Sequence, residues 1–196
     1  MSEELPREQS SPKRQSHRSR LGGPVGEFVI TLVIAFILVF GFVRPFVVEA
    51  YRIPSASMEP TLDIHDRVLA NKFIYDFTDP KRGQIVIFKN PEDPNSDPLI
   101  KRVVGLPGDT LRIQHGKLYV NGVPQNEPYI HKNPCLQFRP KTCSFGPTKV
   151  PPGHVFLMGD NRANSYDSRF FGPVPESSIE GEAFLRFWPP SRLAWL

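Results

Sequence analysis

The chain has 196 residues and a formal net charge of +4 at pH 7, with charged residues at 22% and hydrophobic residues at 39%. This balance fits one globular domain with a small appendage and excludes a wholly disordered chain. The 22 prolines and 14 glycines interrupt the chain too often for a helical bundle or a coiled coil, so short strands and ordered loops are expected. The mild positive charge does not by itself indicate a nucleic-acid-binding protein.

The first 25 residues are polar and rich in Ser, Arg and Glu, with almost no large apolar side chains. Such a segment cannot bury enough apolar surface to offset the entropy that ordering would remove. Residues 1–25 are therefore predicted to form a disordered tail, and the basic side chains in its second half favour the cytoplasmic side of a membrane.

An apolar segment follows, in which residues 28–43 carry no charge and Thr31 is the only clearly polar member. The run has no polar face at a helical period, so a core helix fits it poorly. We therefore expect a transmembrane anchor over residues 26–48, crossing once. A cleaved signal peptide is the alternative, because residues 48–50 resemble a small-x-small cleavage site.

The remaining residues, 49–196, are predicted to form a β-rich domain on the extracytoplasmic side. Short β-branched or apolar runs bounded by Pro and Gly predict strands at residues 68–70, 84–88, 99–104, 110–114, 117–120, 155–158 and 183–187. His115-Gly116 predicts a two-residue hairpin turn and Asn121-Gly122 a second turn. No repeat of 20–50 residues, no Walker loop and no dinucleotide-binding fingerprint occurs in the sequence.

The two cysteines, Cys135 and Cys143, lie eight residues apart in a stretch that reads as a loop. They are too few for a four-cysteine zinc site, and no His/Cys cluster accompanies them, so no metal site is predicted. In an oxidising compartment they can form a disulfide, which is the prediction for an extracytoplasmic domain. Two free thiols in a reducing compartment are the alternative.

Candidate chemistry lies in a Pro-bracketed loop that follows the apolar segment within a dozen residues and contains Ser55 and Ser57. A serine hydroxyl needs a base before it can act as a nucleophile, and none of the five histidines lies in a motif that suggests one. A lysine can serve when burial removes its charge. Lys101 stands in a β-branched stretch where strand alternation can turn it inward. Taken alone, a Ser-rich loop is usually a turn and a strand lysine usually faces water.

Three segments together resemble the characteristic boxes of bacterial type I signal peptidases, which are membrane-anchored serine proteases with a Ser/Lys dyad. In chain order they are PSASMEPTL, IKRVVGLPGD and GDNRANSYDSRFFGPV. The resemblance covers residues 26–189, and its style is similar to cyanobacterial or chloroplast-type enzymes. The fold class it implies is mostly β: a Pro/Gly-rich antiparallel β-sheet catalytic domain, signal peptidase/LexA-like, preceded by one N-terminal transmembrane helix.

The resemblance also implies a role for each matching residue. Ser57 matches the nucleophile and Lys101 the general base. Ser55 matches the hydroxyl that helps the Ser57 amide form an oxyanion hole, and Ser165 matches the serine that hydrogen-bonds to the lysine amine and orients it. Three matching charged residues are expected to brace the site without taking part in the chemistry, namely Asp160, Asp167 and Arg169. The substrate pocket is expected to contain Ile53, Pro54, Met58, Leu62, Leu99 and Ile100.

The implied function is a membrane-bound endopeptidase that cleaves N-terminal signal peptides from exported preproteins. Its implied partners are those signal peptides and a lipid bilayer of the cell or thylakoid, with no cofactor, metal or nucleic acid. One alternative is a catalytically inactive, membrane-tethered β module that binds extended peptides, but an inactive relative would be expected to have lost Ser57 or Lys101. A soluble self-cleaving repressor-type protease is disfavoured by the apolar run. Departures from the family pattern at Gln84, Leu99 and Ala163 leave the substrate preference open.

Overall fold

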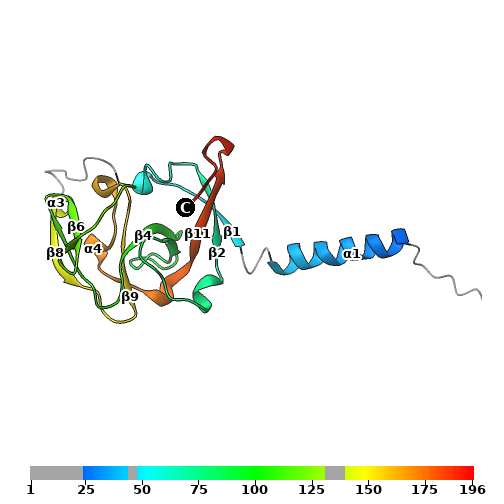
Figure 1. Cartoon of the computed structure of the whole chain (residues 1–196), viewed down its shortest axis with the longest axis horizontal. Helices are drawn as coiled ribbons and strands as arrows, with labels where there is room; N and C mark the ends of the chain where they lie inside the picture. The colour runs from blue at the N-terminus through cyan, green and yellow to red at the C-terminus, as the bar shows by residue number, and fades with distance from the viewer. Residues whose placement is uncertain (1–23, 44–47, 131–139) are drawn as a thin grey trace, which may run out of the picture.

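The computed structural model of the chain describes residues 24–43, 48–130 and 140–196. An apolar helix, α1 (Pro24–Leu38), opens the first range and continues into a π-helical turn, η1 (Val39–Val43). In Figure 1 this helix stands apart from the strands, and its large apolar side chains from Val25 to Phe40 are all exposed.

Within the three described ranges, no helix combines the length and the apolar character needed to cross a membrane. Nearly all of the predicted tail lies outside the described residues, as do residues 44–47 of the predicted anchor.

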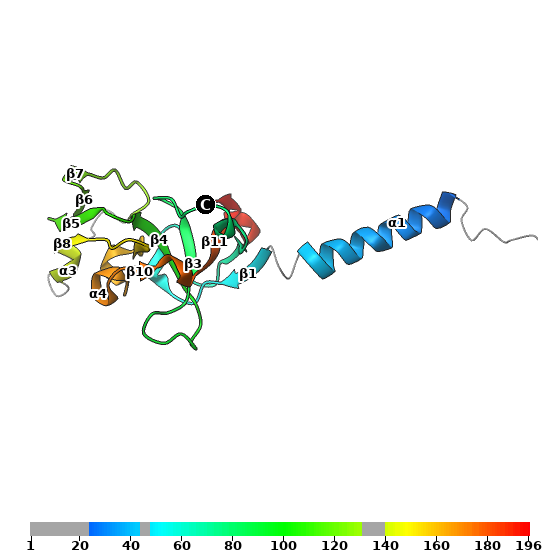
Figure 2. The ribbon, with the colours of Figure 1, turned by 90° about the horizontal axis from the view of Figure 1, so that it is seen from below.

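The rest of the described chain forms two antiparallel sheets (Figures 1 and 2). The larger sheet has the spatial order β1-β2-β11-β3-β4-β9-β10, with β12 paired to β11, so β1 is an edge strand and β4 lies inside. Its strands are β1 (Val48–Arg52), β2 (Arg67–Asn71), β3 (Ile85–Phe88), β4 (Leu99–Gly105), β9 (His154–Met158), β10 (Val174–Pro175), β11 (Ile179–Trp188) and β12 (Ala194–Trp195).

The smaller sheet, in the order β7-β6-β5-β8, is inserted in the chain between β4 and β9. Its strands are β5 (Thr110–Gln114), β6 (Lys117–Val120), β7 (Val123–Pro124) and β8 (Ser144–Lys149). Short helical turns connect the strands: α3 (Pro140–Cys143), α4 (Ser168–Phe171), η2 (Ala56–Met58), η3 (Ile74–Asp76), η4 (Arg162–Asn164), η5 (Glu176–Ser178) and η6 (Pro190–Arg192).

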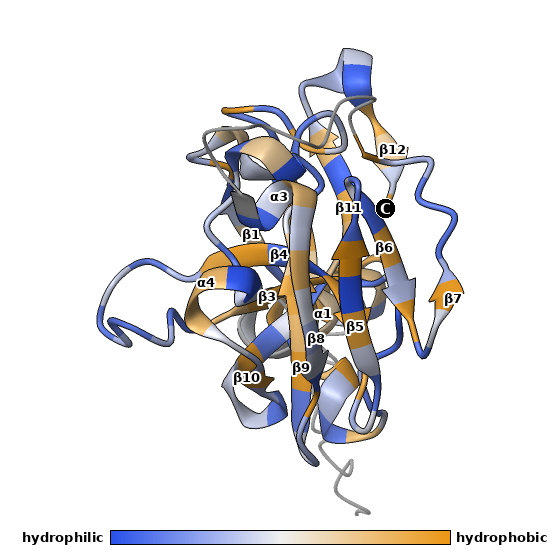
Figure 3. Ribbon diagram, turned by 90° about the vertical axis from the view of Figure 1, so that its left-hand side faces the viewer, coloured by the Kyte–Doolittle hydropathy of each residue, from blue (hydrophilic) through white to orange (hydrophobic). Residues whose placement is uncertain are grey.

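Both predicted turns are confirmed. His115 and Gly116 have φ angles of 50° and 77°, and Asn121 and Gly122 have φ angles of 52° and 82°. Two successive residues with positive φ are what a two-residue turn needs to match the twist of its strands. Figure 3 shows hydrophobic and hydrophilic residues alternating along β5, whose inward residues Leu111 and Ile113 are buried.

The core consists of three clusters of buried apolar side chains. The first lies around Ile53, Met58 and Leu62 and includes residues of β2, β3 and β4. The second joins the smaller sheet to β9, and the third lies among β3, β4 and β9. The central strands β3 and β4 are buried along almost their whole length. The loop that carries Ser57 is therefore attached to the core on both sides of the serine.

All seven predicted strands are present; β5 and β6 have the predicted bounds, and the other five differ by one or more residues. The largest change is at β11, which begins at Ile179, four residues before the predicted start at 183. Gly181 hides this beginning in the sequence, because a glycine weakens a strand pattern. Its missing side chain is required here, since a Cβ would lie 2.7 Å from the Asn71 carbonyl oxygen of β2.

The loop predicted around the cysteines is partly wrong. Residues 140–143 form the helical turn α3, and residues 144–149 form β8, which pairs with β5. Gly146-Pro147 lies inside β8 at an irregularity in the pairing, and such a dipeptide ordinarily signals a loop. Cys143 has no free thiol. Its predicted partner, Cys135, lies outside the described residues, so the pairing itself stays a prediction.

Candidate active site

Ser57 and Lys101 lie side by side although 44 positions separate them in the sequence. Ser57 lies in η2, shortly after the edge strand β1, and Lys101 lies on the inner strand β4. The Lys101 Nζ donates hydrogen bonds to the Ser57 Oγ at 2.9 Å and to the Ile100 carbonyl oxygen at 2.8 Å. The two residues are only 7% and 4% exposed. A hydroxyl and an amine are thus in contact in a nearly dry site.

Burial lowers the pKa of Lys101 to about 8, because the charged ammonium loses its hydration. The carboxylates of Asp167 and Asp160 oppose this effect, since each favours the protonated amine. The balance leaves a large fraction of the amine neutral near pH 8. A neutral amine has the lone pair that a general base requires.

Hydrogen bonds from Asn161 hold the turn that carries Ser57. Its backbone N–H donates to the Ser57 carbonyl oxygen at 3.1 Å, and its side-chain amide donates to the Ala56 carbonyl oxygen at 3.0 Å. The exposed Ser55 donates from its Oγ to the Ser57 Oγ at 3.3 Å. The structure therefore brings the predicted oxyanion-hole hydroxyl and the predicted nucleophile together.

Ser165 lies near this turn without a hydrogen bond to Lys101. Its Oγ is buried and has no hydrogen-bond partner among the described residues. A Cβ placed on Gly159 would lie 2.4 Å from both the Ser165 Oγ and the Ser57 carbonyl oxygen. The absent side chain of Gly159 is what allows these two serines to approach the same point.

Asp160 and Asp167 each form a buried two-point ion pair. Asp160 accepts from the Nε and Nη2 of Arg102 at 2.8 and 2.7 Å, and from the Thr61 hydroxyl at 2.5 Å. Asp167 accepts from the Nε and Nη2 of Arg169, both at 2.8 Å. Burial alone would raise the pKa of Asp167, but Arg169 and the N–H of Gly159 hold it below its usual range. The three predicted supporting residues are thus all members of buried ion pairs.

The predicted pocket residues lie in three different places. Four of them are buried in one core cluster behind Ser57: Ile53, Met58, Leu62 and Ile100. Leu99 is half-buried against a different cluster. Pro54 is exposed and is the one predicted pocket residue among those that line the cavity described next.

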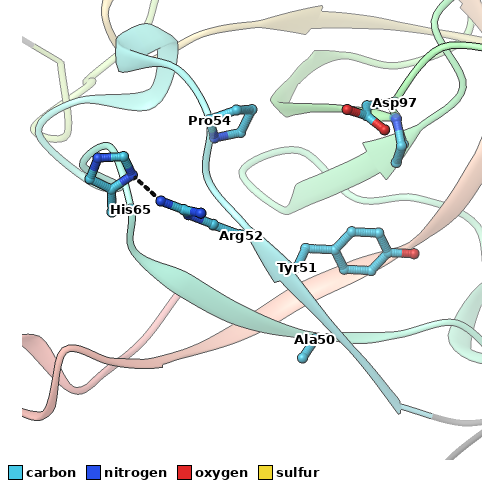
Figure 4. A pocket seen from close by; sticks show the side chains of 7 residues that line it. Ala50, Tyr51, Arg52, Pro54, His65 and Asp97 are labelled. Atoms are coloured by element: carbon cyan, nitrogen blue, oxygen red, sulfur yellow. Dashed lines mark hydrogen bonds between the residues drawn. The ribbon is translucent and has the colours of Figure 1, made fainter.

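A cavity of about 470 Å³ opens beside β1 (Figure 4). Its wall consists of residues from β1, from the following loop and from the loop before β4: Ala50, Tyr51, Arg52, Pro54, His65, Asp97 and Pro98. Arg52 donates to the His65 Nδ1 at 2.9 Å, as the dashed line in Figure 4 marks. The cavity therefore lies along an unpaired strand edge, next to the loop that carries Ser57.

Four residues that make hydrogen bonds or ion pairs around this site were not singled out from the sequence, among them Arg162 and Glu127, which pair with each other. Asn161, Arg102 and Arg162 lie within the boxes, and their position there was a usable signal. Glu127 lies between β7 and the cysteine stretch and carries no local signal. Across the described residues, no group of three or more His, Cys, Asp and Glu side chains could hold a metal ion.

The comparison with protein families identifies the family to which this chain belongs. A family model described as signal peptidase, peptidase S26, matches residues 25–188. The chain belongs to this family. A probable signal peptidase I-2 of Synechocystis sp. is 44% identical over 100% of this chain and 86% of its own length. The thylakoidal processing peptidase 1, chloroplastic, of Arabidopsis thaliana is 41% identical over 77% of this chain and 45% of its own length.

Among solved structures, a signal peptidase I from Enterococcus faecalis matches this chain with 36% identity and a TM-score of 0.46. The match covers 54% of this chain and 97% of the other.

Proposed function

We propose that this signal peptidase family member is a serine endopeptidase that removes N-terminal signal peptides from exported preproteins. The observation that carries the proposal is the 2.9 Å contact between the Lys101 amine and the Ser57 hydroxyl in a chain whose relatives are signal peptidases. Both groups are buried, and the lowered pKa of Lys101 supports its use as a base. The proposal needs no metal and no cofactor.

The first half of the reaction acylates the enzyme. The neutral amine of Lys101 takes the proton of the Ser57 hydroxyl, and the Ser57 Oγ attacks the carbonyl carbon of the scissile peptide bond. The oxyanion that forms accepts hydrogen bonds from the Ser57 N–H and the Ser55 hydroxyl. The C–N bond then breaks, and the Lys101 ammonium returns the proton to the departing amine of the mature protein.

The second half releases the signal peptide. Lys101 takes a proton from a water molecule, and the resulting hydroxide attacks the ester carbonyl carbon. The ester bond to Ser57 breaks, and the Ser57 Oγ recovers a proton from Lys101. The buried hydroxyl of Ser165 has no hydrogen bond to another described residue, so we propose that it rotates to accept one N–H of the neutral amine and fixes the direction of its lone pair.

We propose that the preprotein binds in extended form along β1. This strand pairs with β2 on one side only, so its other edge offers free backbone groups for an added strand. The cavity beside it contains Pro54 and ends near the Ser57 loop. The apolar residues behind Ser57, including Ile53 and Ile100, form the floor under small substrate side chains.

We also propose that α1 and the following turn hold the enzyme at a bilayer as a single-pass anchor with its N-terminus in the cytoplasm. The apolar side chains of this segment are exposed around the whole helix, and a lipid environment is the one in which such a surface is stable. The catalytic domain would then lie on the extracytoplasmic side of a cell or thylakoid membrane.

The test is cleavage of a preprotein by the full-length enzyme in detergent, with the cut located by mass spectrometry. We expect one cut, after a small residue at the end of the signal peptide, and no cut by Ser57→Ala. EDTA should leave the rate unchanged. An intact preprotein after incubation with the folded parent enzyme, or cleavage by Ser57→Ala at the parent rate, would disprove the proposal.

A further inference from the structure

A buried ion pair links the catalytic region to the segment between strands β7 and β8 of the smaller sheet. The guanidinium of Arg162 donates from Nη1 to the Glu127 Oε2 at 3.0 Å and from Nη2 to the Glu127 Oε1. The two side chains are only 2% and 4% exposed. Glu127 follows β7, whereas Arg162 begins η4 in the third box. A carboxylate buried this deeply is stable only because its partner is buried with it.

Tyr129 connects the same segment to a second arginine. The guanidinium carbon of Arg102 lies 4.1 Å from the centre of the Tyr129 ring, a cation–π geometry. The Tyr129 hydroxyl donates to the Glu127 Oε1 at 3.2 Å. Glu127 and Tyr129 together therefore contact both Arg102 and Arg162, and we call these two residues the Glu127–Tyr129 clip.

Both arginines that contact the clip also form hydrogen bonds with residues close to the catalytic serine. Arg102 pairs with Asp160, which accepts from Thr61 in the loop after Ser57. The Nε of Arg162 donates to the Gly159 carbonyl oxygen at 3.1 Å. Gly159 lies so close to the Ser57 carbonyl oxygen and to Ser165 that a side chain would not fit between them. A small displacement of Gly159 must therefore displace the two serines.

The clip also completes a charge balance. Three buried arginines face three buried carboxylates in pairs: Arg102 with Asp160, Arg169 with Asp167, and Arg162 with Glu127. Asp160 and Asp167 are the charged groups that act on the Lys101 amine, and Asp167 also acts on Arg162. The cluster is neutral as a whole when Lys101 is neutral, which is the form the proposed reaction requires.

We propose that Glu127 and Tyr129 are positioning residues for the reaction, which hold Gly159 and the Ser57 loop through two arginines and complete the charge balance around Lys101. The inference rests on the proposed peptidase function. It assigns a catalytic purpose to a segment outside the three boxes, where no sequence signal marks one. The smaller sheet would thereby act on the dyad without contributing a group that touches the substrate.

The test compares Glu127→Gln with the parent enzyme over a range of pH, using the full-length protein and one preprotein. The substitution keeps the shape and removes one negative charge, so the cluster of arginines and carboxylates carries a net positive charge. We expect kcat to fall roughly tenfold or more with KM nearly unchanged. The acidic limb of the profile should move to lower pH by about half a unit, because a positive surrounding disfavours the ammonium.

The direction in which the acidic limb moves distinguishes the proposed effect of charge from a mere loosening of the packing. A site that merely loosened would admit water, and hydration would move the limb to higher pH. Glu176→Gln is the matched control, since it makes the same chemical change in η5, outside the cluster; it should keep the parent kcat and the parent limb. A limb that stays in place or moves to higher pH in Glu127→Gln would overturn the proposal, as would a parent-like kcat.

The Tyr129→Phe variant tests the same proposal if the Glu127→Gln variant does not fold. It keeps the ring over Arg102 and removes only the hydroxyl that donates to Glu127. We expect kcat to fall roughly two- to fivefold at constant KM, and a parent-like kcat would overturn the proposal. Failure of the peptidase function itself would be distinguishable, because the parent enzyme would then cleave no preprotein in the same assay.

Discussion

Lys101 is the residue at which stability and function conflict most clearly. A lysine on an inner strand, 4% exposed, would be destabilising in a protein without a use for it. Here the same burial that disfavours its charge makes its lone pair available beside Ser57. Two measurable consequences follow, one on rate and one on the free energy of unfolding.

The rate should depend on pH through the Lys101 amine. Its pKa in the folded enzyme is about 8, compared with 10.5 for a free lysine, and the proposed mechanism uses the neutral amine. Activity on a preprotein should therefore be highest above pH 8 and should fall about tenfold for each pH unit below it. The measurement is kcat/KM from pH 5 to pH 10. A profile that stays level down to pH 5 would exclude Lys101 as the base.

Replacing Lys101 should abolish activity and increase stability. Because the pKa is lower in the folded state, the unfolded chain binds more protons between pH 8 and 10.5, and the parent gains stability as pH rises through that window. Below pH 8 the full cost of the buried charge is present. Lys101→Met should therefore be inactive and more stable at pH 7 by about 1–3 kcal/mol.

Urea unfolding at pH 7 and at pH 11 measures this gain, which should largely disappear at the higher pH. Lys89→Met, at an exposed position, is the matched control and should give no comparable gain. Lys101→Arg should be inactive as well, because a guanidinium stays protonated. A Lys101→Met enzyme that is less stable than the parent at pH 7 would contradict the account of the buried charge.

At the scale of elements, the site is made by three short segments that meet: η2 with Ser57, strand β4 with Lys101, and the turn from Gly159 to Ser165. Gly159 is a point of close approach between the first and the third, since a Cβ there would lie 2.4 Å from the Ser57 carbonyl oxygen. Asp167, two residues beyond the end of the turn, holds its start by accepting a hydrogen bond from the Gly159 N–H at 3.0 Å. Neither the turn nor η2 can move independently of the other.

Gly159→Ala should therefore remove activity. The added Cβ would lie 2.4 Å from the Ser165 Oγ and the Ser57 carbonyl oxygen, and displacing the nucleophile by about 1 Å can cost roughly a hundredfold in rate. Gly41→Ala is the control, because its Cβ would meet only Ile37 at an ordinary 3.9 Å. The kcat of both variants on one preprotein is the measurement. A Gly159→Ala enzyme with parent-like kcat would show that this close approach does not position Ser57.

The strands could be predicted where one physical signal dominates. Alternating residues and a turn with two positive φ angles specify the β5–β6 hairpin locally, so its bounds were predicted correctly. Strand β8 could not be predicted because Gly146-Pro147 interrupts its local pattern. The strand is stabilised by pairing with β5, and that pairing exists only in the folded chain. The same reason applies to β11, whose start at Ile179 depends on a close approach to β2.

In the candidate site, too, some features follow from the sequence and others arise only in the folded chain. Ser57 and Lys101 could be paired from the resemblance of their boxes, and the structure brings them into contact. Sequence reasoning gave no route to Glu127, because its partner Arg162 lies 35 positions away and only the folded chain makes them neighbours. The expected hydrogen bond between Ser165 and Lys101 is another case, since a hydroxyl rotamer depends on what surrounds the group and not on local sequence.

At the scale of the whole molecule, the distance along the chain from the apolar segment to the nucleophile is short. Val48 begins β1 and Ser57 follows nine positions later, so an extended chain would place them at most about 30 Å apart. The open edge of β1 and the cavity beside it lie within the same stretch. A substrate whose apolar part remained in a bilayer could therefore reach Ser57 only if the enzyme were held at the same surface.

Removing residues 1–47 should separate catalysis from positioning. The deletion leaves β1, and with it the larger sheet, intact. The truncated enzyme should cleave a short soluble peptide within about twofold of the full-length rate, because the dyad and its arginines are unchanged. Against a preprotein embedded in lipid vesicles its rate should fall roughly tenfold or more, because a shared membrane raises the effective concentration of enzyme and substrate.

The measurement compares the cleavage rates of both enzymes in matched detergent and on vesicles, with full-length Ser57→Ala as the blank. Equal rates on vesicles would show that the apolar segment contributes nothing to positioning, and a loss on the soluble peptide would show that it supports the fold of the site.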